Sequence, residues 1–396
     1  MNKIIIAPDS YKGTISSKEA CEIIESAALE SFPDLSVIKL PISDGGEGFV
    51  DSMLYSCGGE KVTVTVKDPL WRNLDAYYAI LPNGTAIIEM AAASGLPLLS
   101  EREKNPLETT TYGTGQLIVH ALERGCDHIV LGLGGSATND GGIGMGAALG
   151  IRFLQNNQEV PLCGKGMEEI KLIDTSGLNP KLRAVKITIA CDVTNPMYGE
   201  NGAAYIYGPQ KGANPDDEKR LDAGLKNLAE IINRDINYKI EEIPGSGAAG
   251  GMAGLLLAYS SAQIRPGLEI VLDAMDFEKH LQNCDMVITG EGRTDQQSTM
   301  GKVIAGVSNR AKEWDVPVVV ISGTLEDGSE ELLQTGVVAM FSCCRHLISL
   351  EDTLKDAKKD LYKIANNLFR LLKAAEPIIP ASVAFFILLF FRQMYY

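Results

Sequence analysis

Hydrophobic residues along the chain gather into short apolar runs that are separated by polar, glycine-rich loops. The runs that predict buried strands are 3–7, 37–42, 128–131, 185–190, 285–289, 316–322 and 336–341. Apolar positions at helical spacing predict helices, among them 114–123, 215–233, 252–259, 302–312 and 350–372. Strands that alternate with helices are typical of α/β folds with parallel sheets. The pattern therefore predicts an α/β protein.

The pattern changes in the middle of the chain. Residues 61–66 alternate polar and apolar, and the runs 76–81 and 85–90 flank Asn83-Gly84, a strong hairpin signal. Antiparallel strands after two βα units indicate a second domain. We expect a doubly wound domain built from both chain ends, residues 1–62 and 285–373, with an α/β domain inserted at 63–284.

The last residues of the chain do not follow this pattern. Residues 377–391 are nearly uncharged, but the run is shorter than the roughly twenty residues that span a bilayer. We therefore expect 374–396 to be an atypical apolar tail, buried or disordered, or an atypical end of the reading frame, rather than a membrane anchor.

Charge and cysteine content narrow the class of protein. The 36 basic and 51 acidic residues give a formal net charge of −15, which argues against nucleic acids and anionic membranes as partners. The eight cysteines form no Cys-x-x-Cys pair, and the four histidines show no zinc spacing. The first residues lead into a strand without the layout of a signal peptide, so a reduced cytoplasmic protein is expected. Assembly of identical chains stays open.

One loop stands out, residues 132–146, which hold seven glycines in fifteen positions. It follows the strand at 128–131 and runs into a helix, an arrangement that presents free backbone N–H groups to an anion. Each glycine adds chain entropy that folding must overcome, so packing alone is a poor explanation and we expect the loop to hold phosphate. There is no Walker motif. Gly142–Ala147 matches the letters of a dinucleotide fingerprint, but it begins too far after the strand and lacks the acid about twenty residues later.

Carboxylates and glycines recur together in loops at the predicted strand ends. These loops include Asp9-Ser10 with Lys12, Asp44 with Glu47, Thr138-Asn139-Asp140, Asp192, and Glu291-Gly-Arg293-Thr-Asp295. Phosphoryl transfer needs such parts: donors and cations for phosphates, carboxylates for Mg²⁺, and a carboxylate that takes the proton of the attacking hydroxyl. Lys12 and Arg293 are the natural cations.

Several of these residues have a structural alternative. Asp44 and Asp140 could simply cap the helices that follow them, and Asp192 could form an Asx turn. Lys12 could be a solvated loop lysine, and Arg293 could pair with a neighbouring carboxylate, Asp295 or Glu291.

Two further loop features are weaker. The second glycine-rich loop, 245–251, could bind a ligand or only allow close helix packing. Ser136 is a poor candidate for a hydrolytic nucleophile, because no Gly-x-Ser-x-Gly elbow surrounds it and no histidine lies in a comparable loop.

Taken together, five sequence blocks closely resemble the type-1 glycerate kinase family of bacteria. The blocks are residues 7–13 (APDSYKG), 41–48 (PISDGGEG), 134–142 (GGSATNDGG), 245–251 (GSGAAGG) and 289–295 (TGEGRTD). Their order and spacing cover the chain from residue 1 to about 373, and the departure begins after Lys373. The resemblance implies ATP-dependent phosphorylation of D-glycerate, most often at the 2-hydroxyl to give 2-phosphoglycerate. It also implies a Rossmann-like domain made from both chain ends, an inserted α/β domain, and an active site in the cleft between them.

The residue roles expected on this basis are hypotheses. Asp192 is the first candidate for the base and Asp295 the second, and Lys12 would stabilise charge on the transferring group. Arg293 would hold the glycerate carboxylate together with the loop of Asp9 and Ser10. The ATP phosphates would lie on Gly134, Gly135, Ser136, Thr138, Asn139 and Asp140. Mg²⁺ would be held by Asp44 and Glu47.

Two other functions are compatible with the sequence. The chain could phosphorylate a different small hydroxy acid, since pocket shape sets the substrate. It could instead be a non-catalytic regulator that binds a ligand, although it lacks a DNA-binding helix pair and keeps the full set of carboxylates.

Overall fold

A computed structural model describes residues 1–375 of the chain except 12, 44–47, 300–302 and 345–349. Contacts divide the chain into two compact units: unit 1 consists of Met1–Ile42 and the residues from Asp276 onward, and unit 2 of Ser43–Met275. The expected apolar tail lies outside the described residues, apart from its first two positions. Among the described residues, no helix combines the length and the apolar character needed to cross a bilayer.

Unit 1 is built on a parallel five-stranded sheet. Its order is β16 (Val337–Ser342), β14 (Val318–Ser322), β12 (Met286–Thr289), β1 (Lys3–Ile6) and β2 (Ser36–Lys39). These strands match five of the predicted apolar runs, with boundary shifts of a few residues.

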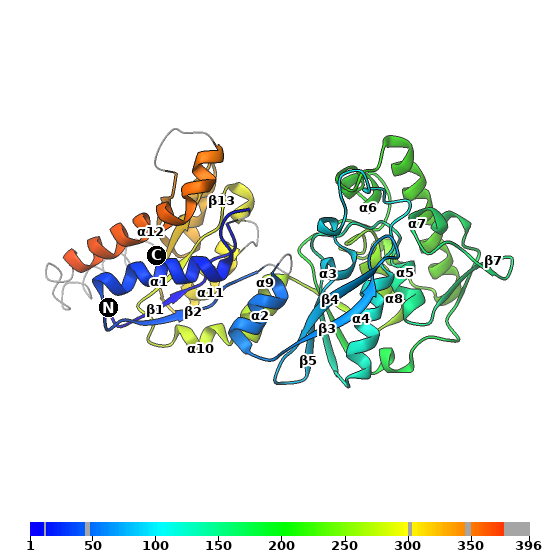
Figure 1. The fold of residues 1–396 in the computed structure, drawn as a ribbon, viewed down its shortest axis with the longest axis horizontal. Helices are drawn as coiled ribbons and strands as arrows, with labels where there is room; N and C mark the ends of the chain where they lie inside the picture. Colours follow the sequence, from blue (N-terminus) through cyan, green and yellow to red (C-terminus); the bar gives the residue numbers. More distant parts are fainter. Residues whose placement is uncertain (12, 44–47, 300–302, 345–349, 376–396) are drawn as a thin grey trace. The chain divides into compact units, whose positions relative to one another are not determined.

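Alternate strand residues of this sheet point to opposite faces. Ile4, Ile6 and Ile321 pack in one buried cluster with α1 (Ser17–Ser31) and α12 (Leu350–Ala375), which lie side by side in Figure 1. Ile5 and Val287 are also fully buried but belong to the opposite face, and α11 (Val303–Glu313) contacts the neighbouring strands β12 and β14.

The start of α1 follows the sequence signal closely. The Ser16 side chain accepts a hydrogen bond from the backbone N–H of Glu19, and the Glu19 carboxylate accepts one from the backbone N–H of Ser16. This capping box satisfies two of the N–H groups that have no partner inside the helix. The predicted box is confirmed.

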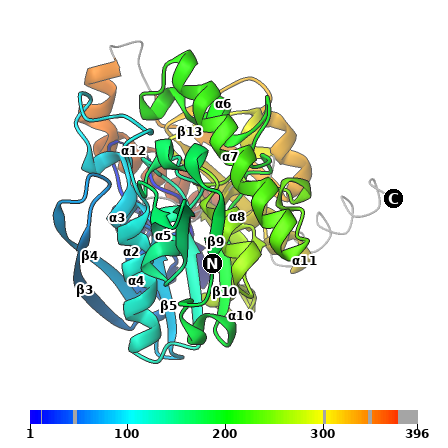
Figure 2. The same cartoon turned by 90° about the vertical axis from the view of Figure 1, so that its right-hand side faces the viewer.

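Unit 2 is built on a mixed six-stranded sheet. Its order is β11 (Gln263–Arg265), β10 (Lys186–Ala190), β6 (His128–Gly132), β5 (Thr85–Glu89), β4 (Asn73–Ile80) and β3 (Glu60–Lys67). The first four strands are parallel, whereas β4 pairs antiparallel with both β5 and β3. The predicted Asn-Gly hairpin is thus confirmed. Figure 2 shows α4 (Tyr112–Glu123) lying across this sheet.

Unit 2 also contains a small sheet that the sequence analysis missed. It consists of β8 (Gln158–Glu159), β7 (Arg152–Gln155) and β9 (Leu172–Asp174). The strands are only two to four residues long, so they carry too few positions for a period of two to be recognised. The long helix α7 (Pro215–Ile236), by contrast, was predicted and carries its proline in the first turn.

The borders of the units differ from those expected at 62/63 and 284/285. Helix α2 (Phe49–Cys57) belongs to unit 2, because the Val50 N–H donates to the Glu89 carboxylate at 2.6 Å and α2 contacts α9 (Gly267–Ala274). Helix α10 (Phe277–Leu281) belongs to unit 1, because Glu278 forms an ion pair with Arg310 of α11 at 2.7 Å. Tertiary contacts place both helices, and strand patterning alone does not report them.

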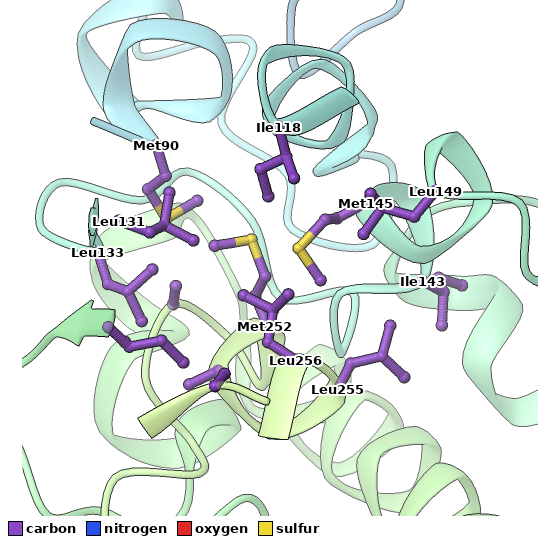
Figure 3. Close-up of a cluster of buried hydrophobic side chains, with 14 of the residues drawn as sticks. Met90, Ile118, Leu131, Leu133, Ile143, Met145, Leu149, Met252, Leu255 and Leu256 are labelled. Atoms are coloured by element: carbon purple, nitrogen blue, oxygen red, sulfur yellow. The ribbon is translucent and has the colours of Figure 1, made fainter. Parts of the chain in front are cut away.

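Much of the glycine in 132–146 serves packing in the core of unit 2. Figure 3 shows Met145 of α5 (Ile143–Ala148) beside Met252 of α8 (Met252–Tyr259). A Cβ at Gly142 would lie 2.9 Å from the Met252 Cα, and one at Gly146 would lie 2.8 Å from a methyl carbon of Leu255. The expectation that packing could not explain so many glycines is therefore too strong for this half of the loop.

Candidate functional site

The unit 1 pocket is a cavity of about 640 Å³ at the carboxyl ends of β1, β12 and β14. It is lined by Asp9 and Ser10, which follow β1, and by Arg293 and Asp295, which follow β12. The structure thus brings together four of the residues that the sequence analysis assigned to substrate binding or catalysis. Lys12, expected beside them, lies outside the described residues.

The cation of this pocket is already paired. Arg293 Nη2 lies 2.7 Å from a Glu326 oxygen and Nε lies 3.4 Å from Asp295, while its side chain is 62% exposed. One of the alternatives considered for Arg293, an ion pair with Asp295, is present in the structure. Exposed pairs of this kind contribute at most about 1 kcal/mol, so they leave Arg293 able to exchange partners.

Buried polar groups fix the loops around the unit 1 pocket. The Tyr11 hydroxyl donates to the Ile321 carbonyl at 2.5 Å, and its burial raises the pKa of this phenol. The Glu291 carboxylate accepts hydrogen bonds from Ser298 at 2.5 Å and Thr294 at 3.3 Å. The Tyr11 bond ties the loop after β1 to β14, and the two bonds to Glu291 hold the loop after β12 together.

The unit 2 pocket is a cavity of about 340 Å³ lined by the loops after β6 and β10. Gly134, Gly135 and Ser136 come from the predicted phosphate loop, and Asp192 comes from the loop after β10. The structure therefore unites half of the expected ATP-binding residues with the first candidate for the base.

Asp192 stands on the exposed rim of this pocket. Its Oδ1 accepts a hydrogen bond of 3.0 Å from the backbone N–H of Gly267, the first residue of α9. A carboxylate at a helix N-terminus is stabilised in its charged form by the free N–H groups there. This bond orients the carboxylate without burying it.

The remaining half of the phosphate loop is buried away from this lining. Asp140 accepts hydrogen bonds from Thr111, both N–H and hydroxyl at 2.9 Å, and from the N–H groups of Gly142 and Gly144 at 3.0 and 3.3 Å. Burial raises the pKa of Asp140, and these hydrogen bonds oppose that shift. Asp140 thus caps α5, the structural alternative that the sequence left open.

Thr138 and Asn139 precede Asp140 and are fully buried as well. The Thr138 hydroxyl and both polar atoms of the Asn139 amide find no hydrogen-bond partner in the part of the chain that is described. Buried polar groups are nearly always paired, so these three atoms mark a place where a polar partner is missing.

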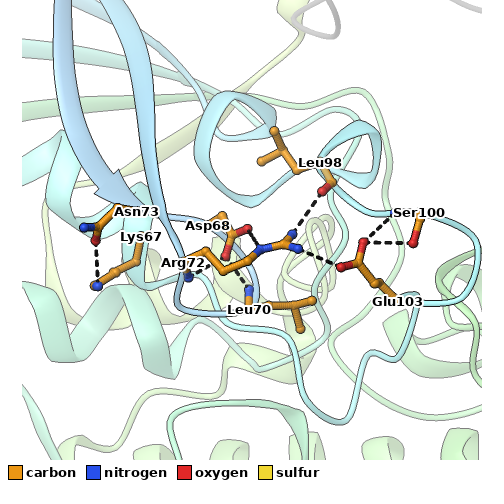
Figure 4. Close-up of polar contacts among 8 residues, drawn as sticks. All are labelled: Lys67, Asp68, Leu70, Arg72, Asn73, Leu98, Ser100 and Glu103. Atoms are coloured by element: carbon orange, nitrogen blue, oxygen red, sulfur yellow. Dashed lines mark hydrogen bonds and ion pairs between the residues drawn. The ribbon is translucent and has the colours of Figure 1, made fainter.

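A polar network supports the segment that holds Asp140. In Figure 4, Arg72 lies between Asp68, at 2.5 Å, and Glu103, at 2.6 Å. The turn after Asp68 is linked to the segment that holds Asp140, because the Thr110 N–H donates to the Pro69 carbonyl and the neighbouring Thr111 donates to Asp140. The network keeps Thr111 in place for its two bonds to Asp140.

The second glycine-rich loop, 245–251, packs against the first. The Gly141 N–H donates to the Gly250 carbonyl, and a Cβ at Gly250 would lie 2.3 Å from the Thr138 carbonyl oxygen. Close packing therefore accounts for glycine in this loop, and its Ala248 and Ala249 line the unit 2 pocket.

One charged residue of the unit 2 pocket was missed. Lys211 lies in the turn Pro209–Lys211, and only 2% of its surface is exposed. Its Nζ donates to Ser136 Oγ and to the Thr138 carbonyl, both at 2.7 Å. The sequence signal that could have found it is a lysine between glycines 208 and 212 in an acidic protein.

The metal-binding prediction is not placed by the structure. Asp44 and Glu47, the expected ligands of Mg²⁺, lie outside the described residues. Within the described ranges, no group of three or more histidine, cysteine or carboxylate side chains could hold a metal ion.

Comparison with known proteins identifies the family. The model of the glycerate kinase family matches residues 4–373. The chain is 43% identical to glycerate 2-kinase of Escherichia coli K12 over 368 residues, which cover 92% of this chain and 97% of the relative. It is 44% identical to glycerate kinase of Haemophilus influenzae over 373 residues, which cover 93% of this chain and 98% of the relative.

A solved structure agrees with these relatives. The fold is similar to that of a crystal structure from Salmonella typhimurium LT2 whose protein is provisionally named glycerate kinase 2. The TM-score is 0.84 and the sequence identity 44%, and the superposition covers 95% of this chain and 99% of the other. The chain therefore belongs to the glycerate kinase family and is a kinase with a mixed α/β fold.

Proposed function

We propose that this protein transfers the terminal phosphoryl group of ATP to the 2-hydroxyl of D-glycerate, giving 2-phosphoglycerate and ADP. The observation that carries the proposal is the unit 2 pocket, which combines a glycine-rich loop at a strand end with an exposed, oriented carboxylate. The relative from Escherichia coli is named glycerate 2-kinase, which supports the choice of hydroxyl.

The phosphate chain of ATP fits the first half of the glycine loop. In the described part of the chain, the backbone N–H groups of Gly134, Gly135 and Ser136 donate to no protein acceptor. Gly135 has a φ of +74°, a conformation that L side chains rarely adopt, so glycine is needed to turn the loop. Free N–H groups at such a turn bind phosphate oxygens.

The other three residues of the loop contribute differently. Asp140 would hold the loop in shape through its cap. The unpaired polar atoms of Thr138 and Asn139 are available to a bound group or to an ordered water that accompanies it.

D-Glycerate would bind in the unit 1 pocket. Arg293 would exchange one of its carboxylate partners for the substrate carboxylate, which it can hold through two parallel N–H bonds. The loop of Asp9 and Ser10, whose N–H already donates to the Asp9 carboxylate at 2.6 Å, would complete the substrate site.

The proton of the attacking hydroxyl would go to Asp192, with Asp295 as the second candidate. Asp192 is exposed at the rim of the pocket and is held there by the Gly267 N–H, so its carboxylate is accessible to a substrate hydroxyl. Lys12 would stabilise the charge that develops on the transferred group.

The phosphoryl transfer would need Mg²⁺, which supplies positive charge to the phosphates when it is bound. Asp44 and Glu47 are proposed as its protein ligands. EDTA should abolish turnover, and added Mg²⁺ should restore it.

The proposal includes the organisation of the protein. Unit 1, a parallel sheet with helices on both faces, is the Rossmann-like domain, and unit 2 is the inserted domain. We place the enzyme in the cytoplasm, with small-molecule substrates as its partners.

A coupled assay that detects ADP tests the proposed function. ADP should form with D-glycerate and ATP, and phosphorus NMR should identify 2-phosphoglycerate rather than the 3-phosphate. ADP formed only with another hydroxy acid would change the substrate, and no ADP from any hydroxy acid would favour the non-catalytic regulator.

A further inference from the structure

Lys211 is a buried cation that has no carboxylate among its hydrogen-bond partners in the described part of the chain. Its ammonium group donates to two neutral oxygens, Ser136 Oγ and the Thr138 carbonyl. Within the described ranges it forms no ion pair, unlike Arg293, the exposed cation of the unit 1 pocket. An ammonium group has three donors, so one N–H has no acceptor in the part of the chain that the structure describes.

Such an arrangement is costly for the protein alone. Moving an ammonium group out of water costs several kcal/mol unless a partner of opposite charge compensates it. Burial accordingly lowers the pKa of Lys211 to about 7, and the nearby Asp140 only partly opposes this shift. The missing partner is therefore expected to be an anion that enters from the pocket.

Close packing of the backbone on both sides of Lys211 fixes the turn that places it in the unit 2 pocket. A Cβ at Gly208 would lie 2.2 Å from the Ala204 carbonyl oxygen, and one at Gly212 would lie 2.3 Å from the Lys104 carbonyl oxygen. This tight packing on both sides fixes the turn from which the lysine extends. Lys211 also lines the same cavity as Gly134 and Gly135, whose N–H groups have no acceptor among the described residues.

We propose that Lys211 is the cation that binds the phosphate chain of the nucleotide and, through Ser136 and Thr138, positions the loop that carries it. The inference rests on the proposed function for the choice of nucleotide over other anions. Three donors then converge on one phosphate group: the lysine ammonium and the N–H groups of Gly134 and Gly135. The assignment adds a third cation to Lys12 and Arg293.

Calorimetric titration of ADP into matched variants tests this role. Lys211→Met keeps the length and burial of the side chain, and the ADP dissociation constant should rise roughly ten- to hundredfold, as for loss of a hydrogen bond to a charged group. Lys165→Met is the control, because Lys165 is paired with Glu108 at 2.7 Å and its side chain is 39% exposed. The ADP dissociation constant of this variant should stay within twofold of the wild-type value. An equal affinity of Lys211→Met and the wild type would overturn the inference.

Further ligands separate the possible sources of the anion. Inorganic pyrophosphate should show the same loss as ADP, whereas D-glycerate should bind Lys211→Met as it binds the wild type. A loss confined to D-glycerate would assign the lysine to the acid and overturn the inference. A wild-type enzyme that binds ADP and pyrophosphate but forms no product from D-glycerate would instead contradict the proposed function alone.

Proton uptake supplies a readout that needs no methionine variant. A lysine that is largely neutral at pH 8 must take up a proton when an anion binds, so ADP binding in buffers of different ionisation enthalpy should show uptake approaching one proton. Lys211→Arg stays charged and should show none beyond that of ADP itself.

Other titratable groups lie near Lys211 or line its pocket, and the comparison with Lys211→Arg separates their contribution from that of the lysine. Asp192, Cys191 and Tyr207 line the pocket, and Asp140 lies near Lys211 outside this lining. Burial raises the pKa values of Cys191 and Tyr207, so both stay neutral near pH 8 in the free protein. An uptake that is identical in the wild type and in Lys211→Arg would contradict the role of Lys211.

Discussion

The cations of the two pockets differ in exposure and in charge pairing. In the unit 1 pocket, Arg293 is 62% exposed and paired with two carboxylates, Asp295 and Glu326. In the unit 2 pocket, Lys211 is 2% exposed, and its acceptors in the described part of the chain are two neutral oxygens. A paired surface cation can exchange its partner at little cost, whereas a buried and uncompensated cation is held at a cost that an incoming anion relieves.

This difference indicates a division of roles. The unit 2 pocket, which has one buried cation and the backbone N–H groups of a glycine-rich loop, suits a multiply charged phosphate chain. The pocket with paired charges suits a small acid, whose single carboxylate replaces one that is already present.

Replacing Asp192 by Asn should have the largest effect. The amide cannot take the proton of the attacking hydroxyl, so kcat should fall by about 10²- to 10⁴-fold while ADP affinity is kept. Steady-state kinetics with Asp295→Asn as the matched variant compares the two pockets. Near-normal turnover in Asp192→Asn, with a large loss in Asp295→Asn, would move the base to unit 1.

Asp140→Asn should act on stability rather than on phosphate binding. The new NH₂ group would face donors instead of accepting from them, which should cost about 2–4 kcal/mol of unfolding free energy. Urea unfolding measures this loss, and Asp127→Asn, which changes an exposed carboxylate of the same unit, should change stability by less than about 0.5 kcal/mol. Unchanged stability with a large loss of ADP affinity would instead make Asp140 a ligand-binding residue.

The stability of the free protein should depend on pH through Lys211. Its folded pKa of about 7 is below the ordinary value near 10.4, so between these values the unfolded state binds more protons and stability rises with pH. Relative to Lys211→Met, the wild type should gain up to about 1.4 kcal/mol per pH unit above pH 7. Below pH 7 the difference should be constant. Urea unfolding measures this dependence. If the difference in unfolding free energy between the wild type and Lys211→Met stays constant from pH 7 to 9, burial does not lower the pKa of Lys211.

The smallest effect is expected for Arg293→Ala. The KM for D-glycerate should rise about tenfold with ADP affinity unchanged, because the substrate interaction replaces ion pairs that Arg293 already makes. Arg152→Ala, which removes an exposed paired arginine of unit 2, is the control and should leave KM unchanged. A KM within twofold of the wild type would remove Arg293 from the substrate site.

Local sequence patterns predicted much of the fold. Three kinds of feature could be predicted because each depends on residues close together in the chain. They are the strands that coincide with apolar runs, the Asn-Gly hairpin and the Ser16–Glu19 capping box. The positions of α2 and α10 were not, since they depend on contacts with residues far away in the sequence, such as that of Val50 with Glu89.

The candidate site was predictable to the same extent. Parallel strands end at one edge of a sheet, so the gathering of Asp9, Ser10, Arg293 and Asp295 followed from strand order. The roles of individual side chains did not follow. Asp140 and Ser136 lie in one loop, yet the first is enclosed by four hydrogen-bond donors and the second lines a pocket.

Lys211 shows the same limit most clearly. Its position in the pocket depends on the packing of Gly208 and Gly212, which local pattern does not report.

The most direct test of the division of roles is one set of titrations, ADP and D-glycerate each into Lys211→Met and Arg293→Ala. The account predicts a crossed result: Lys211→Met loses affinity for ADP but not for D-glycerate, and Arg293→Ala loses affinity for D-glycerate but not for ADP. Equal losses of both ligands in both variants, or the reverse pattern, would contradict the account.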